Sequence, residues 1–445
     1  MAEAEGIRRL YWRFVVLGVA TLAAWNVYIL LTGYFRWALR ATPFKDSFES
    51  VFSVLSNSVN LAALFHALVT QEEANLDRRI RGGLIATAAS FGAMLLVAAV
   101  GLDGWAALVV ALVSLGVAAA AAAYIQCSIF GIAAPLPPRC AEGYMGGQAI
   151  AGTIASAVQL AAIYSGPDGA NAAPSAVAEA GPGHLRLHAA AFFGASMLFL
   201  ALCIGVWAQL HSHLSRRSNG SGGSGLLVSA ARTSADTDMD RTYSSLLPAP
   251  EGTAQRAAKW LDSLLGPSAA QPICAACAET APFAAIAGMV MVQTLAVFPP
   301  LTEAIVGSPH SVLKISHLTA WHFLVFNVGD YVGRLSTKWL ECPSLRVLYW
   351  IGHARWLLIP MLLMFPTAGT VPQRTLIVHS DLLFLATVLV LGWTNGWAAT
   401  SALILGPRRA TNKELAGSVL GFAMCTGLFV GAVASFPILL VAGVL

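Results

Sequence analysis

The chain alternates between long apolar stretches and short polar segments. A helix rises about 1.5 Å per residue, so about 20 apolar residues are needed to cross the roughly 30 Å of hydrocarbon in a bilayer. Within lipid the backbone must satisfy its own hydrogen bonds, which favours a helix. The pattern therefore predicts an all-α multi-pass membrane protein with eleven transmembrane helices, at about residues 10–32, 50–70, 82–102, 105–134, 144–165, 187–211, 281–306, 315–338, 345–366, 376–405 and 415–443.

The composition agrees with this pattern. Hydrophobic residues make up 57% of the chain, charged residues make up only 11%, and the mean hydropathy is +0.69. A soluble chain of 445 residues would be more polar, so the lipid bilayer is the expected surrounding. The seven cysteines are few and odd in number, which does not indicate a disulfide framework.

Motifs of enzyme chemistry are missing from the sequence. It contains no phosphate-binding loop, no cluster of metal-ligand residues and no nucleophile beside a base. We therefore expect no catalytic activity, no metal, no cofactor and no nucleic-acid partner.

The basic residues predict the orientation, because loops rich in Lys and Arg stay on the cytoplasmic side. With the N-terminus inside, eighteen of the 26 Lys and Arg residues fall in inner segments and six fall in outer segments. We expect a cytoplasmic N-terminus and, with an odd number of spans, an extracellular or luminal C-terminus. The plasma membrane is the expected location ahead of an organelle membrane, although no specific signal separates them.

One long polar segment, residues 212–278, divides the spans into six and five. It is rich in Ser, Gly and Asp and has too few apolar residues to form a core, so we expect a mostly disordered cytoplasmic loop. Its one amphipathic patch covers residues 254–266. The predicted organisation is an N-terminal lobe at 1–211, this loop, where cytoplasmic regulators would bind, and a C-terminal lobe at 279–445.

The span at 315–338 carries charged residues in its middle. At about 100° per residue, one helix face collects a carboxylate, a guanidinium, an amide, a hydroxyl and two aromatic rings, namely Asp330, Arg334, Asn327, Thr337, Phe323 and Phe326. Placing Asp or Arg at the centre of a membrane helix costs roughly 2.5–3.5 kcal/mol each, so such residues usually face a partner or a cavity. The face forms a helix-packing ion pair, a polar ligand site, or both.

Other predicted spans contribute polar or aromatic residues of the same kind. Taken singly, each is more often an interhelical hydrogen bond, an interfacial anchor or a kink. Their recurrence in many spans indicates a shared polar site, and the residues are Trp25, Asn26, Gln126, Gln148, Phe298, Arg355 and Asn395.

Several of these residues stand in motifs that resemble the equilibrative nucleoside transporters. The matching stretches include "LAAWNVYI", "QCSIFGIAAPLP", "FPPLT", "FNVGDYVGR" and "TNGWAATSALILGPRRA". "FNVGDYVGR" is similar to that family's Phe-Asn-x-x-Asp-x-x-Gly-Arg signature. The resemblance implies a two-lobed bundle of six plus five helices like the major facilitator fold. It also implies transport of nucleosides, with nucleobases as related cargo, by alternating access and facilitated diffusion.

The resemblance also implies a role for each candidate residue. Asp330 would accept from the ribose hydroxyls, Arg334 would donate to the ribose, and Asn327 would support this pair. Trp25 would form a wall for the base and Gln126 would bond its polar edge. The remaining candidates would add apolar contact, in the case of Phe298 and Phe323, or serve gating and packing, in the case of Asn26, Gln148, Arg355 and Asn395.

Two alternatives stay open from the residues. The chain would carry another small polar solute, or it would couple nucleoside transport to protons. Proton coupling needs a titratable group within the membrane, and Asp330 and His322 are the candidates.

Overall fold

The computed structural model describes residues 2–45, 48–71, 73–164, 182–220, 262–263, 267–306, 315–342, 344–367 and 378–444. These residues are almost entirely helical, which confirms the predicted all-α class. The helices are α1 (Ala2–Leu30), α2 (Thr32–Ala38), α3 (Phe48–Val69), α4 (Leu76–Val100), α5 (Gly104–Ala133), α6 (Pro138–Tyr164), α8 (Pro182–Gly220), α11 (Pro267–Val297), α12 (Pro300–Ala304), α13 (Ile315–Ser336), α14 (Leu345–Ala354), α15 (Leu358–Leu363), α16 (Asp381–Arg409) and α17 (Lys413–Ala442), with a 3-10 turn η2 (Arg355–Leu357) between α14 and α15.

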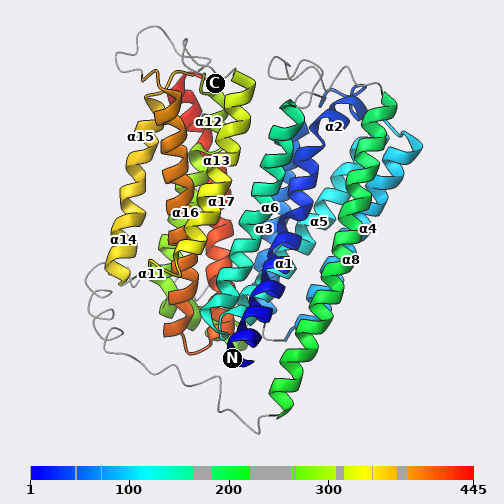
Figure 1. The fold of residues 1–445 in the computed structure, drawn as a ribbon. Helices are drawn as coiled ribbons and strands as arrows, with labels where there is room; N and C mark the ends of the chain where they lie inside the picture. Colours follow the sequence, from blue (N-terminus) through cyan, green and yellow to red (C-terminus); the bar gives the residue numbers. More distant parts are fainter. Residues whose placement is uncertain are drawn as a thin grey trace.

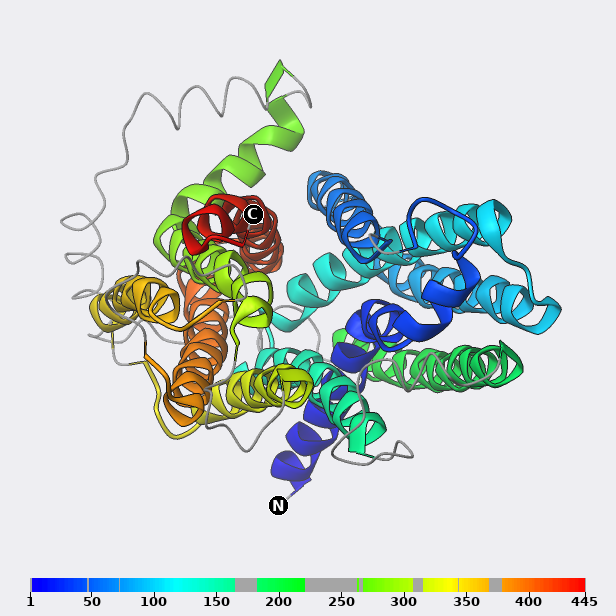
Figure 2. The ribbon, with the colours of Figure 1, turned by 90° about the horizontal axis from the view of Figure 1, so that it is seen from above.

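The helices form two groups, as Figures 1 and 2 show. In the N-terminal lobe, α1 packs on α6 and α8, and α4 packs on α5 and α8. In the C-terminal lobe, α11 packs on α17, and α13 packs on α16. The lobes meet mainly where α6 contacts α13 and where α17 contacts α5 and α3. The chain termini lie at opposite ends of the bundle (Figure 1).

Eight of the described helical segments are long and apolar enough to cross a membrane, which identifies a multi-pass membrane protein. They are Glu5–Leu30, Val51–Val69, Leu76–Val100, Gly104–Ala133, Gly183–Ser215, Ala270–Ala304, Asp381–Arg409 and Lys413–Ala442. The other three expected spans correspond to α6, to α13 and to the segment from α14 to α15. The number eleven stays a prediction.

Helix ends differ from the predicted spans. α8 continues to Gly220 and α11 begins at Pro267, so both helices enter the range 212–278 that the sequence predicted to be a mostly disordered loop. An apolar window detects only the part of a helix that lies in hydrocarbon, while the helix itself continues beyond it. Residues 221–261 and 264–266, which include most of the amphipathic patch, lie outside the described residues.

The predicted span 281–306 is also interrupted. α11 ends at Val297 and the short helix α12 begins at Pro300. Pro299 and Pro300 lack the backbone N–H that would continue the helical ladder, and their rings crowd the preceding turn. The helix is therefore interrupted at Phe298, one of the candidate residues.

Glycine allows α13 and α16 to approach each other closely. A Cβ atom added at Gly333 would collide with the carbonyl oxygen of Trp393, and one added at Gly396 would collide with the carbonyl oxygen of Asp330. Small residues at such contacts let helix backbones pack tightly in membranes. This contact places the α16 residues next to Gly396 against the charged turn of α13.

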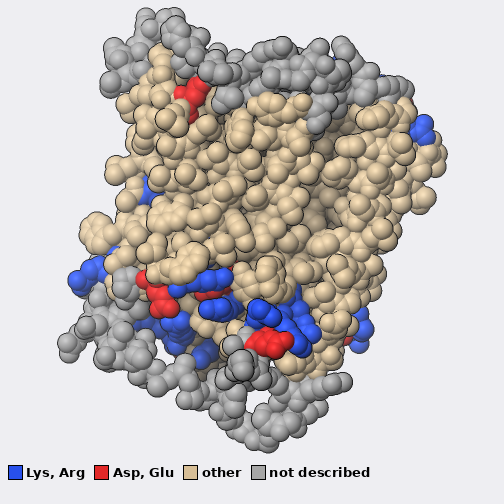
Figure 3. All heavy atoms as spheres, in the orientation of Figure 1, with Lys and Arg blue, Asp and Glu red and all other residues tan. Residues whose placement is uncertain are grey.

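Lys and Arg side chains are concentrated at one end of the bundle. On the face that Figure 3 shows, they gather at the end where Figure 1 places the N-terminus, while the middle of this face is almost free of charge. The uncharged middle band is the surface expected to face hydrocarbon.

Candidate functional site

The two charged residues of α13 form a buried ion pair. Arg334 Nε donates to Asp330 Oδ2 at 2.7 Å, and the two side chains are only 9% and 6% exposed. Because the residues are four apart on one helix, the carboxylate and the guanidinium lie on the same face. The sequence therefore predicted correctly that these side chains share a face.

A second helix holds the other oxygen of the carboxylate. Asn395 of α16 donates its Nδ2 to Asp330 Oδ1 at 2.7 Å. On the opposite side, Arg334 Nη1 lies 3.3 Å from the sulfur of Met145 on α6. The pair is thus anchored within the C-terminal lobe and directed at the N-terminal lobe, with lone pairs on both carboxylate oxygens beyond those two bonds.

Asn327 makes a second contact between the lobes. Its Nδ2 donates at 2.9 Å to Ser156 Oγ on α6 and at 2.9 Å to the carbonyl oxygen of Phe323, one turn earlier on α13. The predicted polar face of α13 therefore lies against α6 over at least two turns.

Aromatic rings surround the next turn of α13. Phe298 stacks on Phe326 with ring centroids 3.8 Å apart and meets Phe323 edge-on at 5.2 Å. His322 is fully buried and lies beside Phe298, Phe323 and Phe384. The two predicted aromatic residues thus form one wall together with Phe326.

The candidates from the N-terminal lobe are less closely joined to the ion pair. Gln126 on α5 donates to Cys425 Sγ on α17 at 3.1 Å and so links the lobes. Trp25 and Asn26 are half-buried on α1, and the buried Asn26 Nδ2 has no hydrogen-bond partner among the described residues. Gln148 is buried and lies within hydrogen-bonding reach of Tyr144. Within the described ranges, none of these four side chains hydrogen-bonds to Asp330 or Arg334.

Arg355 extends the polar cluster away from the lobe interface. It is 2% exposed and donates to Thr294 Oγ1 at 2.6 Å, to Gln293 Oε1 at 3.2 Å and to Thr394 Oγ1. Thr294 in turn donates to Asn395 Oδ1 at 2.8 Å. Arg355 and Asn395, which the sequence assigned to gating or packing, therefore belong to the surroundings of Asp330.

The sequence did not place Met145, Ser156 and Thr294 beside the candidate residues. A serine or threonine in a helix commonly bonds to its own backbone, so its presence alone gives no signal of a partner on another helix. Ser156 does make such a bond, to Gly152 O, while it accepts from Asn327. The single hydroxyl hydrogen of Thr294 lies within reach of both Val290 O and Asn395 Oδ1.

The lobes also touch where the basic residues gather. Lys338, just after α13, places its Nζ 4.5 Å from the centre of the Tyr11 ring on α1. Ser418 Oγ on α17 donates to the Cys127 carbonyl on α5 at 3.1 Å. Burial raises the pKa of the nearby Glu142 carboxyl above its ordinary value, against the opposing charges of Lys338 and Arg139. The two lobes are therefore in contact at this end.

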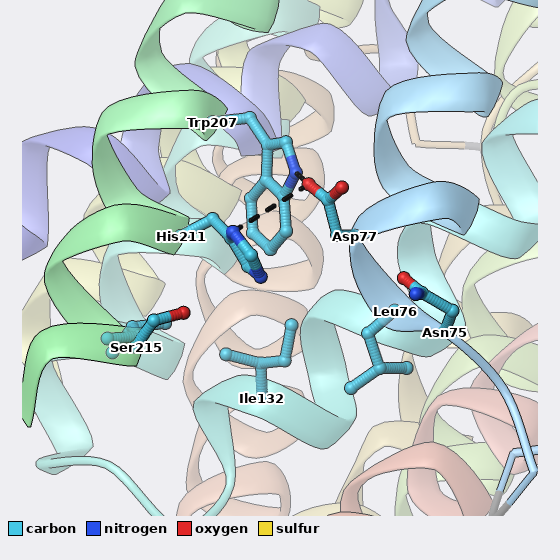
Figure 4. A pocket seen from close by; sticks show the side chains of 8 residues that line it. Asn75, Leu76, Asp77, Ile132, Trp207, His211 and Ser215 are labelled. Carbon is cyan, nitrogen blue, oxygen red and sulfur yellow. Dashed lines mark hydrogen bonds and ion pairs between the residues drawn. The ribbon is translucent and has the colours of Figure 1, made fainter. Parts of the chain in front are cut away.

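A separate groove of about 390 Å³ lies in the N-terminal lobe. Figure 4 shows Trp207 and His211 of α8 directed at Asp77 of α4, with Trp207 Nε1 donating to Asp77 Oδ1 at 2.9 Å. The groove is formed by α4, α5 and α8 and does not include α13. We therefore do not assign it to the same site. Among the described residues, no group of three or more His, Cys, Asp or Glu side chains is placed to hold a metal.

The two-lobed arrangement defines the class of protein. A crystal structure of a Major Facilitator Superfamily transporter, FucP, in the outward conformation matches with a TM-score of 0.55, covering 99% of this chain and 96% of that chain at 14% identity. At this identity the likeness shows the fold. The chain is a helical membrane protein with the major facilitator fold.

Sequence comparison shows the family. The family model described as Nucleoside transporter matches residues 109–440. Equilibrative nucleoside transporter 1 of Rattus norvegicus is 24% identical to this chain, with 95% of each chain covered. Equilibrative nucleoside transporter 1 of Homo sapiens is also 24% identical, again with 95% of each chain covered. The chain belongs to the nucleoside transporter family.

Proposed function

We propose that this chain carries nucleosides, with nucleobases as related cargo, across a membrane by alternating access and facilitated diffusion. The observation that carries the proposal is the geometry of Asp330. Its two oxygens accept from Arg334 and Asn395 at 2.7 Å each, while the pair faces the opposite lobe. The family match supports the cargo, and the names of the relatives support the equilibrative mode.

The ion pair suits a ribose. An ionised carboxylate has about four acceptor positions, and a guanidinium has five N–H donors, so Asp330 and Arg334 keep free positions after bonding each other. Two neighbouring hydroxyls donate to Asp330 and accept from Arg334. Since the pair is neutral as a whole, it suits an uncharged ligand, whereas a phosphate would need cations not already beside a carboxylate.

The base would lie against apolar and amide groups. Phe298 and Phe323 offer aromatic surface next to the charged turn, and flat rings pack well on such surfaces. On the opposite lobe, Trp25 would complete the wall and Gln126 would exchange its weak bond to Cys425 for one to the base. An amide pairs more strongly with a ring nitrogen or carbonyl than with a thiol.

The orientation follows the basic residues. We place the end of the bundle where Lys and Arg gather, which also holds the N-terminus (Figures 1 and 3), in the cytoplasm. The C-terminus then lies on the extracellular or luminal side. The contacts of Lys338 with Tyr11 and of Ser418 with Cys127 then close the cytoplasmic end. The plasma membrane is the proposed location, and the 212–278 segment is the proposed site for cytoplasmic regulators.

Uptake into proteoliposomes tests the proposal. Radiolabelled uridine and adenosine should enter vesicles that contain the full chain, and an excess of unlabelled nucleoside should block this uptake. Asp330→Ala and Arg334→Ala should abolish it. The matched control is Glu5→Ala with Arg9→Ala, which removes an ion pair of the same four-residue spacing from an exposed position and should leave uptake unchanged. Folded wild-type protein that carries neither nucleoside would refute the proposal.

A further inference from the structure

Asp330 stands at the end of a chain of buried hydrogen bonds that begins at Arg355. Arg355 Nη2 donates to Thr294 Oγ1 at 2.6 Å, Thr294 Oγ1 donates to Asn395 Oδ1 at 2.8 Å, and Asn395 Nδ2 donates to Asp330 Oδ1 at 2.7 Å. Each of the four residues is less than 5% exposed. They come from η2, α11, α16 and α13, so the chain of bonds joins four elements of the C-terminal lobe.

The bonds can run in one direction only. A guanidinium has donors and no acceptor, so Thr294 must accept from Arg355. An ionised carboxylate has acceptors and no donor, so Asn395 must present its NH₂ group to Asp330 and its oxygen to Thr294. The hydroxyl hydrogen of Thr294 also lies within reach of the Val290 carbonyl at 2.9 Å, but the Asn395 oxygen needs a donor and Thr294 provides it.

Arg355 has no carboxylate partner at ion-pair distance within the described residues. Its remaining donors go to neutral groups, namely Gln293 Oε1 at 3.2 Å, the Leu391 carbonyl at 3.0 Å and Thr394 Oγ1. A buried cation is costly in a membrane protein, and a neutral residue would serve helix packing at a lower cost. The groups that accept hydrogen bonds from Arg355 therefore indicate its role.

We propose that Arg355, Thr294 and Asn395 are positioning residues that hold Asp330 as an acceptor for the ribose hydroxyls, and so make transport depend on the 2′- and 3′-hydroxyl groups. This inference rests on the proposed function. The three residues act through Asp330 and do not themselves touch the nucleoside. When the Thr294 hydroxyl is removed, the Asn395 amide loses the donor that fixes it and is free to turn its oxygen toward Asp330.

The test compares uptake of uridine with uptake of 2′,3′-dideoxyuridine by full-length protein in proteoliposomes. The measured quantity is the kcat/KM for uridine divided by the kcat/KM for dideoxyuridine. This ratio does not depend on how much of the protein is folded. In Thr294→Val, which has nearly the same shape without the hydroxyl, the ratio should fall by about fivefold, the effect of one hydrogen bond. The loss should appear in the KM for uridine, while dideoxyuridine uptake stays near the wild-type value.

Two variants serve as controls. Thr280→Val removes another buried hydroxyl of α11, whose bond goes to its own helix at the Ala276 carbonyl, and it should keep the wild-type ratio. Thr294→Ser retains the hydroxyl and should also keep it. Should Thr294→Val fail to fold, Arg355→Lys takes its place. A lysine keeps the charge but lacks the planar fork that reaches several acceptors, so the ratio should fall here too.

The outcomes separate the two proposals. If Thr294→Val or Arg355→Lys has the same selectivity ratio as the wild type and Thr280→Val, the positioning role alone is overturned. Wild-type protein that carries neither compound would overturn the proposed function and this inference with it. A selective loss of uridine uptake in Thr294→Val, with both controls unchanged, supports it.

Discussion

Helix α13 is held differently by its own lobe and by the opposite lobe. Toward α16 the backbones touch at Gly396, and Asn395 bonds the Asp330 carboxylate at 2.7 Å. Toward α6 the contacts are a thioether, with Met145 sulfur 3.3 Å from Arg334 Nη1, and two neutral hydrogen bonds, from Asn327 to Ser156 at 2.9 Å and from Trp321 to Tyr164 at 3.3 Å. Hydrogen bonds to charged groups contribute about 1.5–3 kcal/mol and neutral bonds about 0.5–1.5 kcal/mol.

This difference indicates that the lobes separate more easily between α13 and α6 than α13 separates from α16. Separating α13 from α6 breaks neutral hydrogen bonds and the contact of the Arg334 guanidinium with a thioether, a weak acceptor, and it leaves the ion pair whole. Separating α13 from α16 would instead remove a hydrogen-bond partner from a buried carboxylate. We therefore expect the lobes to rock apart along α6 and α13 at a lower cost than separation of α13 from α16. Such rocking around a fixed site is what alternating access requires.

The largest expected effect comes from breaking the ion pair within the lobe. Asp330→Leu leaves Arg334 buried without its carboxylate, and removing one partner of a buried pair typically costs about 3–5 kcal/mol. The double variant Asp330→Leu with Arg334→Met removes both charges and should recover most of that stability without recovering transport. Thermal unfolding of the purified proteins checks the first part, and uridine uptake checks the second. A double variant that is as unstable as the single one would contradict the comparison.

Next in size is the close approach of α13 and α16. Gly396→Ala places a methyl group against the Asp330 carbonyl, and overpacking of this kind typically costs about 1–3 kcal/mol. Transport should fall as well, because Asn395 is the neighbouring residue. Gly116→Ala in α5 is the matched control, since a Cβ there meets nothing within 4 Å. Equal melting temperatures for the two variants would argue against a tight contact.

The α13 face illustrates what the sequence could predict. Helical spacing alone brings Asn327, Asp330 and Arg334 to one side, because it depends only on the 3.6-residue repeat. The contact of Asn395 with Asp330 depends on two glycines on different helices, and no local pattern reveals which helices they join. Nothing in the sequence indicated the partners of Thr294 and Ser156 on other helices, since most hydroxyls in helices bond to their own backbone.

The fold, too, was predictable where it depends on a local pattern in the sequence. Apolar windows correctly predicted a helical membrane protein, because the bilayer forces this solution. They misplaced the end of α8, which continues to Gly220, and the start of α11, which begins at Pro267. A helix outside hydrocarbon needs no apolar run. They also missed the break after Val297, although the adjacent prolines, Pro299 and Pro300, were visible in the sequence.

A smaller effect on stability is expected where α13 contacts α6 of the opposite lobe. Ser156→Ala removes the neutral bond to Asn327, which keeps its second acceptor at the Phe323 carbonyl. Stability should change by less than about 1.5 kcal/mol, and the ion pair should be untouched. The uridine KM should stay near the wild-type value while the maximal rate changes by a few fold, because the contact between lobes is what differs. A large rise in KM would instead place Ser156 at the ligand.

The smallest effect concerns the closed end of the bundle and its dependence on pH. Glu142 is buried there, and its pKa is raised by burial, against the charges of Lys338 and Arg139. A carboxyl whose pKa is raised in the closed state binds its proton more tightly there than in the open, hydrated state. Closure is therefore favoured as the pH falls, and this contribution is lost as the pH rises through the raised pKa, in the window above the ordinary value of 4.5.

Glu142→Gln, which resembles the protonated form, should remove this pH dependence and hold the end closed at neutral pH. Because the charges of Lys338 and Arg139 oppose the effect of burial on Glu142, the population shift should be less than about fivefold. Spin labels at Arg8 and Arg346, exposed positions of opposite lobes, would report the separation of the lobes at each pH. Glu5→Gln is the control, since that carboxylate pairs with Arg9 in the open. If the distance distribution of the wild type does not change with pH, Glu142 stays equally buried when the lobes rock. Its part of α6 would then not separate from the opposite lobe.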